Sequence, residues 1–400
     1  MSRKTTAADV VVIGGGVIGT AVAYFLAKCR MDVTLIERGG IACGTSGRCE
    51  GNVLVQDKLP GFDCQLAKLS QELFPVVARE IDIDIGWTRK GSLLVIESEE
   101  ELEAAAVFCG QMAAEGLPVR MLDAYAVHED EPNLASDIVG GLEFACDGTL
   151  NPMALSQGLS LKAEQLGAVM RTYTTVTGIR LDSSGGICGV DTDCGSILTP
   201  RIVNAAGIWA PHIGKMIDLD IPVKPRKGQV LVSERTFQVA RRTVIEFGYL
   251  MAKFGKGDYQ RRITPEMEKY GIAFVFEPTD AGNFLIGSSR QFTDTDTTVD
   301  VHVLKAMAQR AIRFFPVIQQ IQIIRSYAGF RPYTPDHFPI VSETRVPGFY
   351  VAAGHEGDGI GLSLITGKLM AQIITREPTD IAIEPLRLDR FEGRAFLNQG

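Results

Sequence analysis

The sequence predicts an α/β fold in which a domain with a parallel sheet is joined to an α+β domain with an antiparallel sheet. Near the start, apolar residues 10–13 run into a G-x-G-x-x-G turn at residues 14–19. A helical pattern follows, and a second apolar segment at residues 33–36 ends at Glu37. This strand–helix–strand order is the Rossmann-like unit from which parallel sheets are built. From residue 223 to about 286 the sequence is strand-like and alternating, as in an antiparallel sheet.

The other elements follow from local patterns. Leu66, Leu69, Leu73 and Phe74 recur at the spacing of one helix face. A serine at 98 with a glutamate three residues on is a helix capping box. In chain order we expect a helix at 64–78, a strand at 91–97, a helix at 98–115, a strand and turn at 140–149, a helix at 152–166, strands near 172–181, 187–193 and 197–204, a helix at 301–315, and a final strand, Gly-rich turn and helix from 351 to about 374.

The glycine turn predicts a dinucleotide site because each glycine has a physical task. Gly14 permits the tight turn, Gly16 lets the backbone approach a pyrophosphate, and Gly19 lets the helix pack close to the strand. The helix N-terminus offers N–H groups and a positive dipole end to phosphates. Glu37 is placed to accept hydrogen bonds from a ribose diol. A lone G-x-G-x-x-G is weak evidence, but here the strand, helix and terminal acid accompany it.

Composition and cysteine content limit which partners and which cellular location are compatible with the sequence. The 400 residues are 46% hydrophobic and 22% charged, a globular balance with a large core. A net charge of −8 argues against nucleic acid or anionic membrane as partner. The eight cysteines show neither C-x-x-C nor metal-ligand spacing, so we expect free thiols and no metal. The uncharged stretch 10–27 is too rich in glycine for a membrane span, and it lacks the flanks of a signal peptide. A cytoplasmic location is expected by elimination.

Three separated segments resemble one known family. They are the turn at 14–19, the strand end Ala-Ala-Gly-Ile-Trp at 205–209, and Gly-Phe-Arg-Pro-Tyr-Thr-Pro-Asp at 329–336 with the Gly-rich turn 354–362. Over nearly the whole chain they resemble the glycine oxidase and D-amino-acid oxidase family of FAD-dependent amine oxidoreductases. Within that family, residues 44–52 look most like the β subunits of heteromeric dye-linked dehydrogenases, namely hydrogen cyanide synthase, opine oxidase and hydroxyproline dehydrogenase.

The resemblance implies FAD and assigns parts of the chain to it. The glycine turn would hold the pyrophosphate, Glu37 the adenosine ribose, and Arg38 and Val176 the adenine, while the turn 354–362 would stabilise negative charge on the reduced flavin. No cysteine stands directly before Tyr333, as it does in the sarcosine-oxidase branch, so the FAD should be non-covalent. The predicted cofactor-binding residues are Gly14, Gly16, Val17, Ile18, Glu37, Arg38, Gly44, Thr45, Ser46, Gly47, Glu50, Gly51, Asn52, Val176, Ala205, Ala206, Gly207, Trp209, Gly354, His355, Gly357, Asp358, Gly359, Ile360, Gly361 and Leu362.

Arg331 is the main candidate for binding substrate. It matches the family arginine that binds a substrate carboxylate, and its guanidinium offers a planar, always charged fork. The alternative is a surface arginine, or one paired with the nearby Asp336.

The opposite pocket wall departs from the family pattern. The family's glycine oxidases carry His and Tyr where this chain has Ala273 and Val275. Tyr249 is a candidate catalytic substitute, with Phe247 and Tyr259 as further options. His355 is either a proton-transfer residue or only a helix cap, and Glu50 is either a base or a turn ligand.

The implied reaction is hydride transfer from an amino acid, imino acid or N-substituted amino acid to flavin, giving an imine that hydrolyses. Glycine, sarcosine, proline, D-amino acids and opines are all candidates. One alternative is a catalytic or electron-relay β subunit, active only in a complex whose other subunits carry FAD or an iron–sulfur cluster. Another is an NAD-dependent dehydrogenase. We expect the FAD-binding domain at 1–85, 147–220 and 325–400, and the substrate domain at 86–146 and 221–324.

Overall fold

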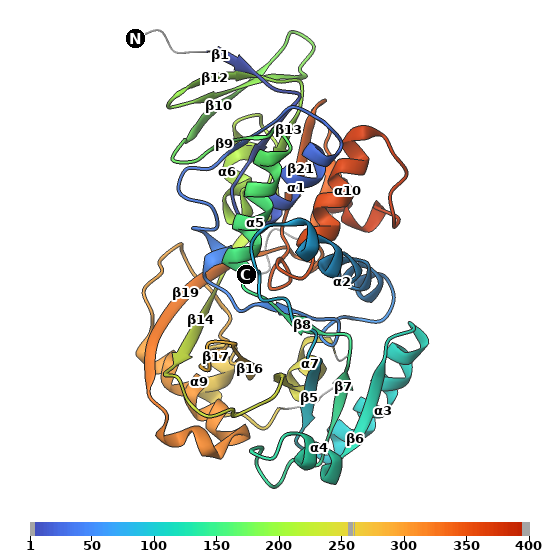
Figure 1. The fold of residues 1–400 in the computed structure, drawn as a ribbon, viewed down its shortest axis with the longest axis vertical. Coiled ribbons are helices and arrows are strands. Elements are labelled where there is room, and N and C mark those ends of the chain that lie inside the picture. The colour runs from blue at the N-terminus through green and yellow to red at the C-terminus, as the bar shows by residue number, and fades with distance from the viewer. Residues whose placement is uncertain (1–4, 255–258, 260, 394–400) are drawn as a thin grey trace.

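The computed structural model of the protein describes residues 5–254, 259 and 261–393. The described chain forms two lobes that lie one above the other along the longest axis (Figure 1). The upper lobe contains a parallel sheet with its helices and a smaller four-stranded sheet. The lower lobe contains a large, mostly antiparallel sheet with helices around it. This confirms the predicted α/β class with parallel and antiparallel regions.

The upper sheet has six strands in the order β20-β21-β13-β2-β3-β9, and all neighbours are parallel except β20 and β21. Its strands are β2 (Val10–Ile13), β3 (Val33–Ile36), β9 (Val169–Arg171), β13 (Ile202–Asn204), β20 (Ile340–Glu343) and β21 (Phe349–Ala353). The smaller sheet, in the order β1-β12-β11-β10, contains β1 (Thr5–Ala7), β10 (Val176–Leu181), β11 (Ile187–Thr192) and β12 (Gly195–Leu198).

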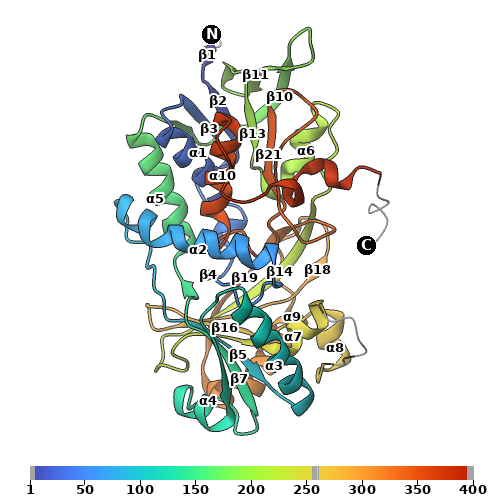
Figure 2. The same cartoon turned by 90° about the vertical axis from the view of Figure 1, so that its right-hand side faces the viewer.

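The parallel sheet is covered on both faces, which explains why its first strand is apolar without alternation. Val10 and Val12 belong to the core formed with the helices α1 and α10, whereas Val11 and Ile13 belong to the core formed with α6 and the smaller sheet. Figure 2 shows α1 and α10 on one side of this sheet and α6 on the other. The helices of this lobe are α1 (Val17–Lys28), α2 (Phe62–Glu80), α5 (Pro152–Gln165), α6 (Ala210–Lys215) and α10 (Ser363–Thr375).

The lower sheet has nine strands in the order β18-β14-β17-β16-β15-β5-β7-β6, with β19 pairing β14 as well. Its pairs are antiparallel except for β5 and β15. The strands are β5 (Ser92–Ile96), β6 (Val119–Asp123), β7 (Gly140–Phe144), β14 (Lys224–Ser233), β15 (Thr243–Glu246), β16 (Val275–Pro278), β17 (Phe284–Gly287), β18 (Gln291–Phe292) and β19 (Ile323–Tyr333). Its helices are α3 (Glu99–Ala114), α4 (Ala124–Asp130), α7 (Phe247–Phe254), α8 (Pro265–Lys269) and α9 (Val301–Phe314).

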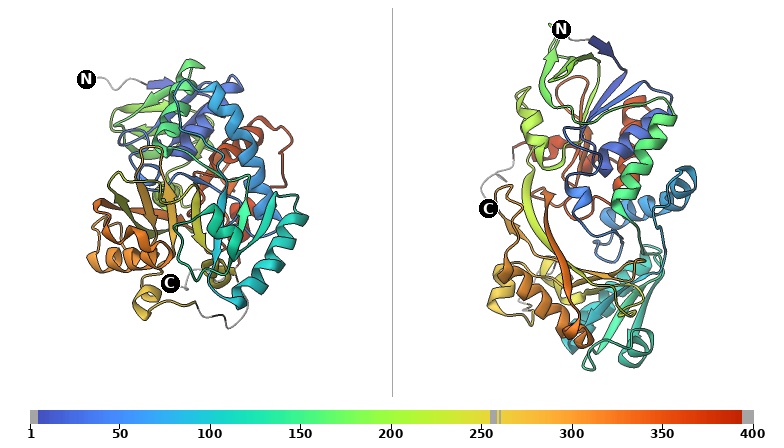
Figure 3. Two further views of the ribbon diagram at one scale, coloured as in Figure 1. Left: turned by 60° about the horizontal axis from the view of Figure 1, so that its bottom comes forward. Right: turned by 60° about the vertical axis from the view of Figure 1, so that its left-hand side comes forward.

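The long strands β14 and β19 run side by side from the lower lobe towards the upper one (Figure 3, right). They therefore bring residues of the large sheet to the boundary between the lobes. A short pair, β4 (Asn52–Val53) with β8 (Gly148–Thr149), and five 3₁₀ turns complete the described elements: η1 (Thr45–Gly47), η2 (Gly207–Trp209), η3 (Pro316–Gln320), η4 (Glu384–Leu386) and η5 (Leu388–Phe391). The exact division into two domains at the predicted residues stays a prediction.

Two local expectations need correction. The segment 223–286 is not continuously strand-like, because it contains α7 and α8. The rings of Phe247 on α7 and Phe108 on α3 lie 6.0 Å apart, a tertiary contact that strand patterning does not reveal. The capping box forms only in half: Ser98 Oγ accepts from Glu101 N–H at 3.3 Å, but the Glu101 carboxylate accepts from Glu97 N–H at 2.7 Å. No described helix is long and apolar enough to cross a membrane.

Candidate active site

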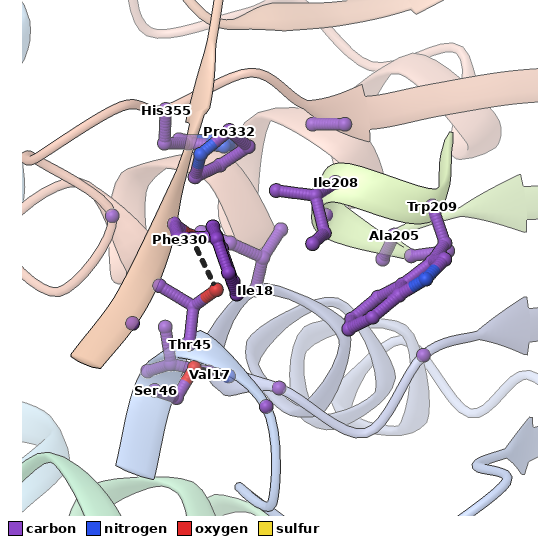
Figure 4. Close-up of a pocket in the computed structure, with 18 of the residues that line it drawn as sticks. Val17, Ile18, Thr45, Ser46, Ala205, Ile208, Trp209, Phe330, Pro332 and His355 are labelled. Carbon is purple, nitrogen blue, oxygen red and sulfur yellow. Dashed lines mark hydrogen bonds between the residues drawn. The ribbon is translucent and has the colours of Figure 1, made fainter. Parts of the chain in front are cut away.

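A cavity of about 490 Å³ lies where β2, β3, β13 and β21 end, at the carboxyl edge of the parallel sheet. This is the edge at which α/β proteins bind ligands, because strand ends and helix N-termini meet there. The loop 44–50 and strand β19 close the cavity from the side of the lower lobe. Figure 4 shows Ile18, Ile208 and Trp209 around the same space as Phe330 and His355.

The three glycines of the first turn have different surroundings. Gly14 has φ +115°, and a Cβ there would lie 2.5 Å from Ala205 O, while a Cβ on Gly19 would lie 1.9 Å from Gly14 O. Both positions therefore need glycine for the protein's own packing. A Cβ on Gly16 would meet only Ser46 Oγ, at 3.2 Å. The space beside Gly16 is open to the cavity, at the N-terminus of α1.

The loop after β3 is held by hydrogen bonds that use residues predicted to bind cofactor. Ser46 Oγ accepts from Val17 N–H at 2.9 Å, and Thr45 Oγ1 donates to Phe330 O at 2.7 Å (Figure 4). Glu37 Oε2 accepts from Gly15 N–H at 2.7 Å, and its Oε1 accepts from Gly39 N–H at 2.8 Å. This loop therefore joins the glycine turn to strand β19.

At the far end of β3, Arg38 and Trp209 stack. The Arg38 guanidinium carbon lies 3.8 Å from the centre of the indole ring, a cation–π contact between the two sides of the cavity. Val176 lies in the same wall.

A smaller cavity of about 110 Å³ adjoins the first. Arg331, Glu50, Gly357 and Ile360 line both, so the two spaces share a wall. Tyr249 lines only the smaller cavity. The structure thus brings together the predicted flavin loop, the predicted substrate arginine and the predicted tyrosine, which are far apart in sequence.

Arg331 is partly buried at this shared wall. Its Nη1 donates to Ser289 O at 2.9 Å, and its guanidinium lies so close to Gly228 that a Cβ there would be 2.2 Å from Nη1. Burial, and then the charge of Arg290, lower the pKa of Arg331. Asp336 instead pairs with Arg390, with Oδ2 2.7 Å from Nε. The structure therefore does not pair Arg331 with Asp336.

His355 is buried, and among the described residues its side chain makes one hydrogen bond, between Nε2 and Thr366 Oγ1 on α10, at 2.9 Å. Burial lowers its pKa to about 3, against the opposing charge of Asp358. The imidazole is neutral at neutral pH and is a weak proton acceptor. Its partner is the side chain of a residue in the first turn of α10, not a backbone group.

The site contains several carboxyl groups with distinct surroundings. Burial, and then the charge of Glu50, raise the pKa of Glu277 to about 8, although its carboxyl accepts from Gly51 N–H at 2.9 Å. Lys58 forms ion pairs with two aspartates: its Nζ lies 2.5 Å from Asp57 Oδ1 and 2.7 Å from Asp358 Oδ1. Burial disfavours its charge, but these carboxylates more than offset it and raise the pKa of Lys58.

Most predicted cofactor residues line one of the two cavities. Those on the larger one are Gly14, Gly16, Val17, Ile18, Glu37, Arg38, Gly44, Thr45, Ser46, Glu50, Val176, Ala205, Ala206, Gly207, Trp209, His355, Gly357, Gly359 and Ile360. Asn52, Asp358, Gly361 and Leu362 line the smaller one. Gly47, Gly51 and Gly354 line neither. A Cβ on them would lie 2.4 Å from Ala42 O, 1.8 Å from Leu150 O and 2.4 Å from Thr334 Cγ2, so chain packing accounts for these glycines.

Sequence reasoning missed polar residues of the smaller cavity, above all Arg226 and Arg290. Neither belongs to a motif, and Arg226 reaches the site only because it is paired with Arg331 across β14 and β19. Cys43, Cys49 and Thr295 were missed on the larger cavity. Only the position of Cys49 within the predicted flavin loop, and of Cys43 directly before it, could have drawn attention to the two cysteines.

Comparison with known proteins agrees with this geometry. The family model of FAD dependent oxidoreductases, DAO, matches residues 9–373. A glycine oxidase from Geobacillus kaustophilus is 30% identical over 96% of this chain and 98% of that protein. Its crystal structure superposes with a TM-score of 0.85, over 96% of this chain and 99% of that one.

Two further relatives are described as parts of larger enzymes. HcnC, a subunit of hydrogen cyanide synthase from Pseudomonas protegens, is 30% identical over 96% of both chains. An opine oxidase subunit from Rhizobium meliloti is 26% identical over 87% of this chain and 89% of that protein. The resemblance to these proteins inferred from the sequence is confirmed.

The described residues also fit FAD on physical grounds. The larger cavity extends from the stacked Arg38 and Trp209, past the open N-terminus of α1, to the turn at 355–360. An elongated dinucleotide needs a site assembled from such separated pieces, and the open space at Gly16 is the cradle that a Cβ would fill. The alternative of an NAD-dependent dehydrogenase is therefore dropped. The chain belongs to the DAO family of FAD-dependent oxidoreductases, as an enzyme of the amine and amino-acid oxidoreductase type.

Proposed function

We propose that the protein oxidises the C–N bond of an amino acid, imino acid or N-substituted amino acid, with FAD in the larger cavity and the substrate in the smaller one. The proposal rests on Arg331, which lines both cavities. A carboxylate bound there by a charge-assisted fork holds the rest of the substrate at the wall shared with the cofactor. Bound FAD supplies the hydride acceptor, and the oxidised substrate leaves as an imine that hydrolyses.

The first turn and the loop after β3 hold the cofactor in this proposal. The N-terminus of α1 would hold the pyrophosphate beside Gly16, where the nearest side-chain atom to a Cβ would be Ser46 Oγ. An ionised carboxylate has about four acceptor positions, and Glu37 uses three of them: Oε2 for Gly15 N–H, and Oε1 for Gly39 N–H and the Cys43 thiol. Acceptor capacity therefore remains for ribose hydroxyls. Arg38 and Trp209 form the wall at the adenine end.

The turn 354–362 holds the other end, and we assign His355 a positioning task within it. An imidazole with a pKa of about 3 is a poor base at neutral pH. Its hydrogen bond to Thr366 instead ties the turn to α10. Tyr249 and Val275 also line the smaller cavity, and they would shield the substrate from water there.

A flavin-bleaching screen under anaerobic conditions tests the proposal. The purified FAD-loaded protein is mixed with glycine, sarcosine, D-amino acids, prolines and opines, and the flavin absorbance is followed. At least one of these compounds should bleach the flavin. The Arg331→Ala variant should need a far higher concentration of that compound for the same bleaching. A protein that none of these amines bleaches, but that a hydroxy acid does, would contradict the proposal.

The second candidate function is that of a subunit active only in a complex, favoured because HcnC and the opine oxidase relative are both described as subunits. The chain is expressed alone and its turnover is compared with dye and with oxygen as electron acceptor. A self-sufficient oxidase turns over with oxygen. Bleaching by substrate with turnover only after partner subunits are added supports the subunit role.

A further inference from the structure

Three arginines gather at the smaller cavity. Arg226 on β14 and Arg331 on β19 are directly paired in the antiparallel ladder, so their side chains project from the same face of the sheet. Arg290 follows β17, and its guanidinium carbon lies 4.1 Å from the centre of the Tyr249 ring. A guanidinium stays charged at any physiological pH. Three positive charges therefore face a space of about 110 Å³.

The protein itself neutralises one of these three charges. Arg226 forms an ion pair with Glu356, which also bonds to His337. Within residues 5–254, 259 and 261–393, neither Arg290 nor Arg331 forms an ion pair, and Arg331 uses Nη1 for the backbone of Ser289. Nε and Nη1 of Arg290 are buried without a hydrogen-bond partner among the described residues. Neither guanidinium group thus has an ion-pair partner in this part of the chain, although the charge of Glu50 acts to raise the pKa of Arg331.

This arrangement is unfavourable until an anion binds. Burial, and then the charges of Arg290 and Arg331, lower the pKa of Arg226 to about 9, even though Glu356 is beside it. A buried cation without a partner costs free energy that a bound carboxylate recovers. Because Arg290 lines the cavity, its guanidinium marks a place for an anionic part of a ligand.

The same cavity contains one carboxylate, that of Glu50, for which the described residues supply no ion-pair partner. Glu50 lines the cavity, and a Cβ on Gly287 would lie 1.9 Å from Glu50 Oε1, so this carboxyl group sits against the end of β17. Lys58 is held between Asp57 and Asp358, so it adds no free positive charge. The charged groups of this cavity without an ion-pair partner among the described residues are therefore two positive, Arg290 and Arg331, and one negative, Glu50, while the group of Lys58 with its two aspartates keeps a net negative charge.

We propose that the substrate carries a second carboxylate: Arg331 binds one carboxylate, Arg290 binds the other, and Glu50 faces the amine. This inference rests on the proposed amine oxidation and narrows its substrate to amino- or imino-dicarboxylates. An amino acid with a single carboxylate leaves Arg290 without an anionic partner. An amino-dicarboxylate, with two negative charges and one positive charge, complements all three groups.

Ligand binding tests this inference without turnover. The FAD-loaded full chain is titrated calorimetrically with succinate and with butyrate, which have the same number of carbons and differ by one carboxylate. Succinate should bind about tenfold to a hundredfold more tightly, the effect of one charge-assisted contact. Arg290→Met should remove this preference, and Arg290→Lys should keep part of it. Arg325→Met is the matched control, because Arg325 is an exposed arginine of the same strand β19, and it should keep the full preference.

Flavin bleaching then separates this inference from the proposed function. Iminodiacetate is compared with sarcosine, and each enantiomer of aspartate with the same enantiomer of alanine. The dicarboxylates should reach half-saturation at about tenfold to a hundredfold lower concentration, and Arg290→Met should narrow that ratio. If the monocarboxylates perform equally well in the wild type, the second-carboxylate inference is wrong while amine oxidation stands. If no amine bleaches the flavin but succinate still binds through Arg290, amine oxidation is wrong and the dianion site stands.

The substitution at Arg290 is checked for folding before either result is read. Circular dichroism and FAD content should match the wild type. Arg290→Gln, which keeps polar hydrogen-bonding capacity without the charge, provides a second variant if Arg290→Met does not fold. A succinate preference that persists in either folded variant overturns the inference.

Discussion

The hydroxyl oxygen of Ser46 lies 2.9 Å from the backbone nitrogen of Val17 and accepts its hydrogen bond. Gly16, the N-cap of α1, has no side chain to perform this task, so a residue from the next loop performs it. The contact fixes the loop after β3 over the first turn of α1. The same two segments form the wall of the larger cavity.

Ser46→Ala should therefore lower the free energy of unfolding. Loss of an N-terminal cap costs about 0.5–2 kcal/mol, and here the N–H of Val17 is left buried. Urea unfolding of the wild type and variant, both in the same cofactor state, measures the difference. Equal midpoints and equal slopes would show that the contact does not contribute to stability.

Two glycine substitutions should have different results. Gly16 has φ −76° and ψ 178°, which valine adopts freely, and its Cβ faces the cavity. Gly16→Val should therefore fold but purify without FAD. Gly14→Val should lose the fold as well, because φ is +115° and the Cβ would lie 2.5 Å from Ala205 O. Flavin absorbance and circular dichroism report the two properties. Full flavin occupancy in folded Gly16→Val would refute the placement of the pyrophosphate.

Acid precipitation should release all the FAD into the supernatant. Phe330, Arg331 and Pro332 occupy the stretch before Tyr333, and the cysteines on the larger cavity are Cys43 and Cys49. Burial raises the pKa of both thiols, together with the charge of Glu37 at Cys43 and of Glu50 at Cys49, so little reactive thiolate forms at neutral pH. Flavin fluorescence that stays with the denatured protein would contradict this, and Cys43→Ser and Cys49→Ser would then locate the link.

Arg331→Ala should weaken substrate capture without loss of FAD. A charge-assisted bond to a carboxylate contributes about 1.5–3 kcal/mol, which corresponds to about tenfold to a hundredfold or more in the concentration that half-reduces the flavin. Arg331→Lys should fall between wild type and Arg331→Ala, since it keeps the charge but not the fork. An amine analogue without the carboxylate, which reduces the wild-type flavin poorly, should reduce the flavin of Arg331→Ala almost equally well. Equal losses for both compounds, or loss of flavin, would make Arg331 a structural residue.

The stability of the protein should depend on Glu277 between pH 4.5 and about 8. The pKa of this carboxyl group rises from the ordinary 4.5 to about 8 on folding, through burial and then the charge of Glu50. Between these values the folded side chain holds a proton that the unfolded one has released, so raising the pH favours the unfolded state. Above about pH 8 both forms are ionised and the dependence ends.

Glu277→Gln tests this pH dependence. Glutamine stays neutral and its oxygen still accepts the N–H of Gly51. The wild type should lose up to about 1.4 kcal/mol of stability per pH unit relative to the variant as the pH rises through this window. Urea unfolding at pH 5.5, 6.5 and 7.5 measures the difference. A constant difference between the two proteins would show that Glu277 is ionised throughout.

The cofactor end of the site could be predicted because its geometry is local. Gly14, Gly16 and Gly19 act within one turn, and Glu37 ends the very next strand of the same βαβ unit. Arg331 is predicted as the carboxylate-binding residue from a motif of contiguous residues. In these cases the chemistry depends on neighbours in sequence, so the sequence by itself determined the fold class and the class of cofactor.

The substrate end was decided only by the tertiary structure. Arg226 meets Arg331 because β14 and β19 pair in one register, and a shift of one residue would turn both side chains to the opposite face. Arg290 reaches the cavity from a third strand end, and Tyr249 from a helix expected to be a strand. Which charges face the substrate depends on sheet register and on packing between segments far apart in the chain, and local pattern contains neither.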